Sequence, residues 1–355
     1  MKKIGLRQKR ALWAAGMLVI ATAAGLLAYG AATRGTSSGF NPLGSALPGF
    51  AVDSADVTEY LITTPDGAYR LTRGKSRWVL MERGGYPAQK DKIESLIAGL
   101  VNLKLERVLT EDAEKFEALR LTDPRQGGSG ALIQATDAQG DERGTLLIGS
   151  SSQGLLVRYP GDNKAYLVHG GLPDLSNPAD FADLDALKIG ADRVQRIDIV
   201  YPSGAALSLE RANPDVAFGP APAKKAKPVA PPPLGSAELA AIALTTTPFH
   251  PVDVKEEPNE TPAGDPLGER RITTFDGLNV RMIFARKDGA LWTLVSAGGG
   301  GSSAEAVAIN SRTSGWAFAF APDDLAHLFP LLPGTGGPPK LKGATDAKLE
   351  AVAAE

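Results

Sequence analysis

The sequence predicts an α+β protein: an N-terminal transmembrane helix followed by two related units, each an antiparallel β-meander with packed helices. Three observations support this prediction. A long uncharged stretch follows a basic N-terminus, short runs of alternating apolar and polar residues recur between turns, and one hairpin pattern occurs twice along the 355 residues.

The stretch between Arg10 and Arg34 has the length of a membrane-spanning helix. Its 23 residues carry no charge, and a helix of that length crosses a hydrocarbon core of about 30 Å. Five basic residues and no acidic residue occupy positions 1–10, which predicts that this end stays in the cytoplasm. We expect a single-pass anchor over residues 11–33, whose apolar and interfacial aromatic side chains are Trp13, Leu18, Val19, Ile20, Leu26, Leu27 and Tyr29.

Two alternatives to this anchor stay open. A cleavable signal peptide would use a small-x-small site such as Ala28-Tyr29-Gly30 or Gly30-Ala31-Ala32. The apolar run is longer than the 7–15 residues usual for such a peptide, which favours the anchor. A buried soluble helix is disfavoured because the segment has no polar face. The anchor and the signal peptide both place most of the chain outside the cytoplasm, on the periplasmic side of the inner membrane, beyond a flexible spacer over residues 34–52.

Composition excludes several classes of function. Beyond residue 10 the chain has 33 basic and 40 acidic residues, a net charge of −7, so it carries no electrostatic footprint for nucleic acid. There is no cysteine, which excludes disulfides, thiolate metal sites and cysteine nucleophiles. The hydrophobic content of 43% is that of a globular protein.

The first predicted unit covers residues 53–190. A strand over Val57–Thr63 precedes a turn at Pro65-Asp66-Gly67. A helix of about 13 residues follows, with one apolar face made of Ile93, Leu96, Ile97, Leu100 and Val101. We further expect a short helix over Glu111–Leu119 and another opening at Asn177-Pro178 with Phe181, Leu184 and Leu187 facing inward.

The second predicted unit, residues 191–330, repeats the pattern of the first. Pro65 and Gly67 recur as Pro202 and Gly204, 137 residues later, and the terminal segment "NPADFADLDAL" recurs as "APDDLAHLFPLL". Two proline-rich insertions, over residues 219–235 and 258–268, interrupt this unit, and a disordered tail is expected over residues 331–355.

Motifs that suggest chemistry are each better explained as structure. Gly74-Lys75-Ser76 lacks the leading glycine of a phosphate-binding loop and precedes a strand, so a polar turn is expected. "GSSSQG" (149–154) is no nucleophile elbow, and "SAGGGGSS" (296–303) is expected to be a hairpin loop with no following helix to hold phosphate.

The remaining candidates also favour structural roles. His169, His250 and His327 have no metal-ligand spacing, and Trp78, Trp292 and Trp316 are predicted core anchors. No catalytic, cofactor or metal site is therefore predicted, and the chain is not expected to be an enzyme. A hydrolase would need a Ser-His-Asp arrangement assembled only in space.

Several segments together resemble one known family. They are "YRLTRGKSRWVL", "KDKIESLIAGLVNLKLERVL", "EKFEALRLTDP", "LLIGSSSQGLLVRYPGDNKAYLV" and "DFADLDALKI". They are similar to the bacterial domain-of-unknown-function family 4340, over Val57–Ile189 and, more weakly, Val194–Pro330. The resemblance implies a membrane-anchored envelope protein like those encoded beside ABC-transporter subunits of the gliding-motility auxiliary type. It implies no catalytic residues.

These observations predict an extracytoplasmic accessory or scaffold protein without catalytic activity. Its expected partners are the cytoplasmic membrane and an ABC transporter permease or another envelope protein, and no nucleic acid. The alternative is a periplasmic small-ligand or glycan-binding module whose ligand lies between the two units. Sequence leaves the oligomeric state open.

Overall fold

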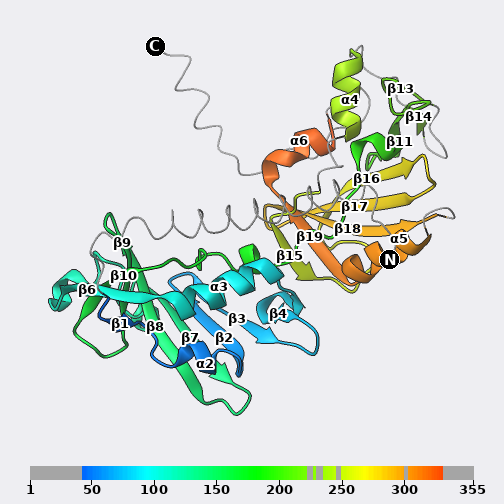
Figure 1. Ribbon diagram of the computed structural model, residues 1–355. Helices are drawn as coiled ribbons and strands as arrows, with labels where there is room; N and C mark the ends of the chain where they lie inside the picture. The colour runs from blue at the N-terminus through cyan, green and yellow to red at the C-terminus, as the bar shows by residue number, and fades with distance from the viewer. Residues whose placement is uncertain (1–41, 222–226, 229–234, 245–248, 300–302, 331–355) are drawn as a thin grey trace, which may run out of the picture.

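The computed structural model describes residues 42–221, 227–228, 235–244, 249–299 and 303–330. These residues form two large sheets, one from the first half of the chain and one from the second (Figure 1). We call residues 42–189 the first lobe and the described part of residues 190–330 the second lobe. Across all of these ranges, no helix combines the length and the apolar character needed to span a membrane.

The first lobe contains a ten-stranded antiparallel sheet in the order β1-β6-β10-β9-β8-β7-β2-β3-β4-β5. Its elements are β1 (Gly44–Ser45), α2 (Phe50–Asp53), β2 (Val57–Thr64), β3 (Gly67–Arg73), β4 (Trp78–Leu80), β5 (Tyr86–Pro87), α3 (Lys90–Asn102), β6 (Lys104–Thr110), β7 (Ala131–Asp137), β8 (Glu142–Ser151), β9 (Gly154–Arg158) and β10 (Ala165–His169). Single 3-10 turns lie at Met81–Arg83, Ala113–Lys115, Pro124–Gln126, Pro178–Phe181 and Ala191–Arg193, the last one opening the second lobe.

The second lobe contains a nine-stranded sheet in the order β13-β12-β11-β16-β17-β18-β19-β15, with β14 pairing parallel to β12. Its elements are β11 (Val194–Val200), β12 (Ala205–Glu210), β13 (Gly219–Pro220), β14 (Lys227–Pro228), α4 (Ser236–Leu244), β15 (Asp253–Glu256), β16 (Asp265–Thr274), β17 (Asn279–Lys287), β18 (Ala290–Gly298), α5 (Ser303–Thr313), β19 (Trp316–Phe320), a 3-10 turn at Pro322–Asp324 and α6 (Leu325–Leu328).

The two sheets share one strand order. When strands are matched in chain order, β4-β3-β2-β7-β8-β9-β10-β6 in the first lobe corresponds to β13-β12-β11-β16-β17-β18-β19-β15 in the second. In each sheet the first hairpin pairs with a strand that comes after the main helix of the lobe. In the first lobe β2 pairs with β7, which follows α3, and in the second β11 pairs with β16, which follows α4. The strand directly after that helix, β6 or β15, lies beyond the last strand of the meander instead.

The predicted α+β class is wrong, because the described residues are mostly β-sheet with few helices. The 13-residue helix is present as α3, but the helices expected over Glu111–Leu119 and from Asn177 are only 3-10 turns. The second one stops because its backbone pairs with another segment: Asp183 donates its amide to the Pro87 carbonyl, and Ala182 bridges Ala88. Tertiary pairing therefore overrides the helical apolar spacing.

Two apolar clusters stabilise the first lobe on opposite faces of its sheet. Neighbouring residues of one strand point to opposite faces, and Leu132 and Ile133 in β7 belong to different clusters. The main cluster holds the buried α3 residues Ile93, Leu96 and Leu100 and continues into the second lobe. The smaller cluster lies under the segment between β6 and β7.

The described part of the predicted spacer is packed and not flexible. The amide of Leu43 donates to the Leu105 carbonyl at 2.8 Å, β1 pairs with β6, and Ala46 and Phe50 are fully buried. The predicted anchor over residues 11–33, with its named side chains, and the tail over 331–355 lie outside the described residues. The other domain boundaries stay predictions.

Candidate functional site

The last residues of the first lobe pair with the segment at β5, the strand that precedes helix α3. Gln89 donates its amide to the Phe181 carbonyl at 2.7 Å, and the hydroxyl of Tyr86 donates to the Asp183 carbonyl at 2.9 Å. Together with the bridge between Ala88 and Ala182, these bonds fix residues 181–183 beside β5. The linker to the second lobe therefore leaves from a defined position.

The two lobes meet edge to edge, and among the described residues one ion pair joins them. The guanidinium of Arg83 donates from Nε to Asp253 Oδ1 at 2.7 Å and from Nη2 to Oδ2 at 2.9 Å. Such two-point pairing fixes orientation as well as distance. Gly84 has φ 68°, and a Cβ there would lie 3.0 Å from the Cβ of Glu256 and 3.3 Å from the Trp316 ring. Glycine therefore permits this close approach.

Aromatic rings fill the rest of the junction. The ring of Tyr86 meets Trp316 at a centroid distance of 4.9 Å and an angle of 79°, and Phe318 at 6.0 Å and 83°. Phe249 continues the contact, at 5.4 Å from Phe318. Edge-to-face geometry places positive ring edges on negative ring faces and adds to the energy of burial. The junction is thus packed as a small core.

An open groove with a volume of about 730 Å³ runs along this junction. Residues of the linker form one wall and the segment before β15 forms the other, and its described lining is Gln89, Asn177, Ala179, Asp180, Ala182, Asp183, Leu184, Asp185, Lys188, Phe249, His250, Pro251 and Val252. Asp180, Asp183 and Asp185 give the linker wall a negative charge that Lys188 offsets in part by pairing with Asp185. Val252 is half exposed at the opposite rim. The groove offers an acidic wall facing an apolar rim.

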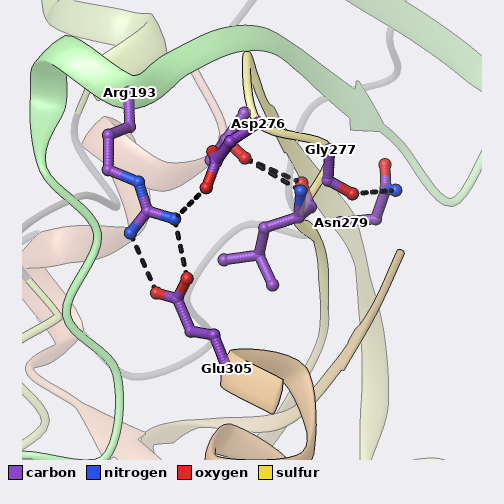
Figure 2. Close-up of polar contacts among 7 residues, drawn as sticks. Arg193, Asp276, Gly277, Asn279 and Glu305 are labelled. Carbon is purple, nitrogen blue, oxygen red and sulfur yellow. Dashed lines mark hydrogen bonds and ion pairs between the residues drawn. The ribbon is translucent and has the colours of Figure 1, made fainter. Parts of the chain in front are cut away.

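A second polar cluster joins the start of the second lobe to helix α5 of the same lobe (Figure 2). Arg193 donates to both carboxylate oxygens of Glu305, at 2.9 and 2.7 Å, and to Asp276 Oδ2 at 2.7 Å. Glu305 lies in the first turn of α5, where the helix dipole favours a carboxylate. The hydrogen bond from Arg193 lowers the pKa of Glu305, and the two carboxylates raise the pKa of Arg193. This cluster is a structural clamp.

One arginine is wholly buried in the second lobe. Arg270 in β16 is inaccessible to solvent, and its guanidinium donates to the carbonyls of Leu328 at 2.6 Å and Ile242 at 2.7 Å. Both carbonyls lie at the C-terminal ends of helices, α6 and α4, where backbone acceptors have no partner within the helix. Burial lowers the pKa of Arg270 to about 10. Arg270 therefore fixes two helix ends with one side chain.

The predicted histidine and tryptophan positions do not converge. His169 ends β10, His250 borders the groove and His327 lies in α6, and no three metal-ligating side chains cluster anywhere in the described ranges. Trp78, Trp292 and Trp316 lie in strands and are partly buried. Trp78 and Trp316 pack against the main cluster, while Lys255 covers Trp292 at 3.9 Å.

The glycine-rich motifs have mixed outcomes. Gly74-Lys75-Ser76 is the expected turn, closed by a 2.8 Å bond from the Gly74 amide to the Arg77 carbonyl. The serines of 149–154 lie in the hairpin between β8 and β9. The expectation that no helix follows "SAGGGGSS" is wrong, because α5 begins at Ser303. Residues 300–302, between Gly299 and that helix, lie outside the described residues.

Sequence reasoning missed the ion pair that joins the two lobes and the one that clamps the second lobe. Arg83 and Asp253 are 170 positions apart, and Arg193 and Glu305 are 112 apart. No local spacing rule joins such pairs. For the buried Arg270, which begins the strand run "RRITT", the sequence did offer a signal: the residue 137 positions earlier, Ile133, is apolar.

Comparison with family models confirms the resemblance found in the sequence. The model described as Domain of unknown function (DUF4340) matches residues 78–235, from the start of β4 to the residue before α4. The match therefore crosses from the first lobe into the second. Comparison with curated proteins and with solved structures finds no significant match.

Proposed function

We propose, on the premise that this chain carries a DUF4340 domain over residues 78–235, that it is an extracytoplasmic accessory or scaffold protein of the cell envelope. Residues 11–33 would anchor it to the cytoplasmic membrane, as their length and lack of charge suggest. Its role would be to hold a transporter permease or another envelope protein, without chemistry of its own.

The locked junction between the lobes is the observation that supports this role most. The ion pair of Arg83 with Asp253 and the ring contacts of Tyr86 join the two lobes at several points beside the groove, which supports a groove that is formed before a partner binds. A groove that is already formed loses little conformational freedom when a partner binds. The acidic wall around Asp180 and Asp183, facing the exposed side chain of Val252, fits a partner segment with basic and apolar residues.

Site-specific crosslinking tests the proposal. A photoreactive phenylalanine analogue at Val252, in the full chain expressed in cells, should give an adduct identified by mass spectrometry as a transporter subunit or another membrane protein. The same analogue at Val216, which is exposed to a similar degree in the second lobe and does not line the groove, is the matched control. Absence of an adduct at Val252, or equal adducts at both positions, would contradict a partner in the groove.

A charge-reversal series sharpens this test. Asp180→Lys should reduce the adduct yield at Val252 at least threefold, because it inverts the charge of the acidic wall. Asp215→Lys, at an exposed acid outside the groove, should leave the yield unchanged. If both changes act equally, the effect comes from net charge and the groove has no special part in it.

A small-ligand or glycan-binding module is the second candidate, favoured by the volume of the groove, which lies within the range of about 300–1,000 Å³ typical of ligand sites. It ranks second because Phe249 is 4% exposed, so the described lining offers no phenylalanine, tyrosine or tryptophan ring for a sugar to stack on. An unchanged melting temperature across a panel of envelope sugars would remove this candidate.

A further inference from the structure

A separate pocket lies within the first lobe, away from the junction. Its volume is about 430 Å³, which suits a small ligand. It opens where the β2–β3 turn, the start of β7, the β8–β9 hairpin and the loop after β10 meet. Its described lining is Thr64, Pro65, Asp66, Arg120, Ser129, Gly130, Ala131, Ile148, Gly149, Ser150, Leu155, Leu172, Pro173, Asp174, Leu175 and Ser176.

Glycines press the β6–β7 segment against the sheet at this pocket. A Cβ at Gly149 would lie 2.3 Å from the Leu119 carbonyl oxygen, and one at Gly130 would lie 2.9 Å from that of Arg120. Side chains at either position would displace the backbone, so the glycines set where Arg120 lies. Gly149 of the "GSSSQG" segment (149–154) therefore helps to position Arg120.

Arg120 occupies a backbone conformation that favours glycine. Its φ is 55°, and it closes a helical turn in which Leu121 bonds back to Phe116 and Arg120 to Glu117. Glycine is the usual residue at that position of such a turn. One other non-glycine residue in the described ranges, Asp288, has a positive φ, and it lies in a tight hairpin turn that requires it. Residues in such conformations are concentrated at ligand and active sites, so Arg120 is a candidate binding residue.

The charges of the pocket are separated. Within the described ranges Arg120 forms no ion pair and Asp66 has no side-chain hydrogen bond, whereas Asp174 accepts one bond from the Ser176 amide at 2.8 Å. The bonds from Ser176 lower the pKa of Asp174, so this carboxylate is ionised at neutral pH. The pocket therefore presents one cation and two anions that do not neutralise one another.

Apolar side chains line the same pocket. Leu155 and Leu172 are partly buried against the main cluster, and Ile148 and Leu175 are buried. The hydroxyl of Tyr69 donates to the Leu175 carbonyl at 2.9 Å, and Gly99 in α3 allows the Gly171 carbonyl oxygen to approach within 2.5 Å of where a Cβ would stand. The loop after β10, which carries Leu172 and Leu175, therefore has contacts to both β3 and α3.

We propose that this pocket binds a small zwitterion with an apolar side chain, an amino acid or a short peptide with free termini. Arg120 would hold the carboxylate, Asp66 and Asp174 would hold the ammonium group, and the leucine side chains of the pocket would cover the side chain of the ligand. This second site is independent of the groove and of any partner there, so either proposal can fail alone.

Calorimetric titration of the full chain in mild detergent tests this site. The probes are leucine, alanyl-leucine and alanyl-alanyl-leucine, and the control is N-acetyl-alanyl-leucinamide, which has neither terminal charge. At least one free probe should bind at least tenfold more tightly than the control. If none binds, or if the blocked peptide binds equally well, the proposal is overturned.

Variants separate binding from folding. Arg120→Gly removes the guanidinium and relieves the backbone, so the melting temperature should stay or rise while affinity falls at least tenfold, the loss expected for a charged hydrogen-bonded contact. Asp288→Gly relieves the same backbone conformation far from the pocket and should leave affinity unchanged. The double change Asp66→Asn with Asp174→Asn should weaken binding of the free peptides and leave the weak binding of N-acetyl-alanyl-leucinamide unchanged. Wild-type affinity in Arg120→Gly would overturn the assignment.

Discussion

The two lobes share a strand order but cover their sheets differently. The first lobe packs the 13-residue helix α3 over its core through Ile93, Leu96 and Leu100. In the same chain position the second lobe has the nine-residue helix α4, with Leu239 and Ala243 buried, and it adds α5 and α6. A single long helix presents few backbone ends to the core, whereas several short helices present many.

One pair of equivalent positions shows how the second lobe provides hydrogen-bond donors for the helix ends that face its core. Ile62 pairs with Ile133 in the first sheet, and Ile199, which is 137 positions after Ile62, pairs with Arg270 in the second. Ile133 is buried in the main cluster, and Arg270 is buried with its guanidinium on two helix carbonyls. The same sheet position therefore holds an apolar residue under a long helix and a donor under helix ends.

Replacing Ile133 of the first lobe by arginine should cause the largest loss of unfolding free energy. Ile133→Arg would bury a charge beneath α3, where the neighbouring side chains are apolar, and we expect it to cost about 4 kcal/mol or more of unfolding free energy. Urea unfolding followed by circular dichroism measures this. Ile133→Leu, which keeps the volume, should cost about 1 kcal/mol. A well-folded Ile133→Arg variant would show that the lobes do not differ in the way proposed.

Changes at Arg270 should have a smaller effect that depends on the replacement. Arg270→Ala leaves a cavity and two unpaired carbonyls and should cost about 3 kcal/mol. Arg270→Met fills the space and removes the desolvated charge, so we expect a loss of about 1 kcal/mol. Thermal unfolding of both variants compares them. Equal losses would mean that the carbonyl bonds, and not packing, account for the role of Arg270.

The contact between the lobes should contribute less. Arg83 and Asp253 are a quarter to a third exposed, and we expect Arg83→Ala to cost about 1 kcal/mol. Small-angle scattering should also show a larger radius, because the ion pair orients the lobes. Arg70→Ala removes a more exposed pair inside the first lobe and should leave the scattering unchanged. An unchanged radius in Arg83→Ala would show that the aromatic contacts suffice.

The clamp at Arg193 should give the smallest effect, and it should depend on pH. The folded pKa of Glu305 lies below its usual value of 4.5 because Arg193 donates to it. Its stabilising contribution is therefore present above about pH 4.5 and is lost as pH falls through the folded pKa. Solvent screening holds this contribution to about 0.5 kcal/mol, since Glu305 is 34% exposed.

Stability measured at pH 7 and pH 3 should show this difference. Glu305→Gln should reduce the pH dependence of unfolding, whereas Glu260→Gln, at an exposed acid outside the cluster, should not. The same pH dependence in all three proteins would remove Glu305 from the clamp.

Sequence by itself determined the local elements. The alternation over Val57–Thr63, the apolar face of α3 and the repeated Pro-x-Gly hairpin at 65–67 and 202–204 each depend on neighbours a few positions apart. The same information gave the resemblance to DUF4340, whose family model matches residues 78–235. It did not predict that Phe181 ends a short 3-10 turn or that Leu187 lies in no helix. The apolar periodicity indicates which side chains are buried and gives no information about which segment the backbone pairs with.

Only the tertiary structure decided the candidate sites. The groove needs the linker beside β5 and the second lobe at Asp253, and the first-lobe pocket needs Gly149 pressed against the segment that carries Arg120. The sequence identifies Arg270 only as a strand residue, and its contacts with the ends of two helices are visible only in the tertiary structure. The physical reason is common to all three. Each depends on hydrogen bonds, charges or close backbone contacts between residues far apart in the chain, and local propensity carries no information about those partners.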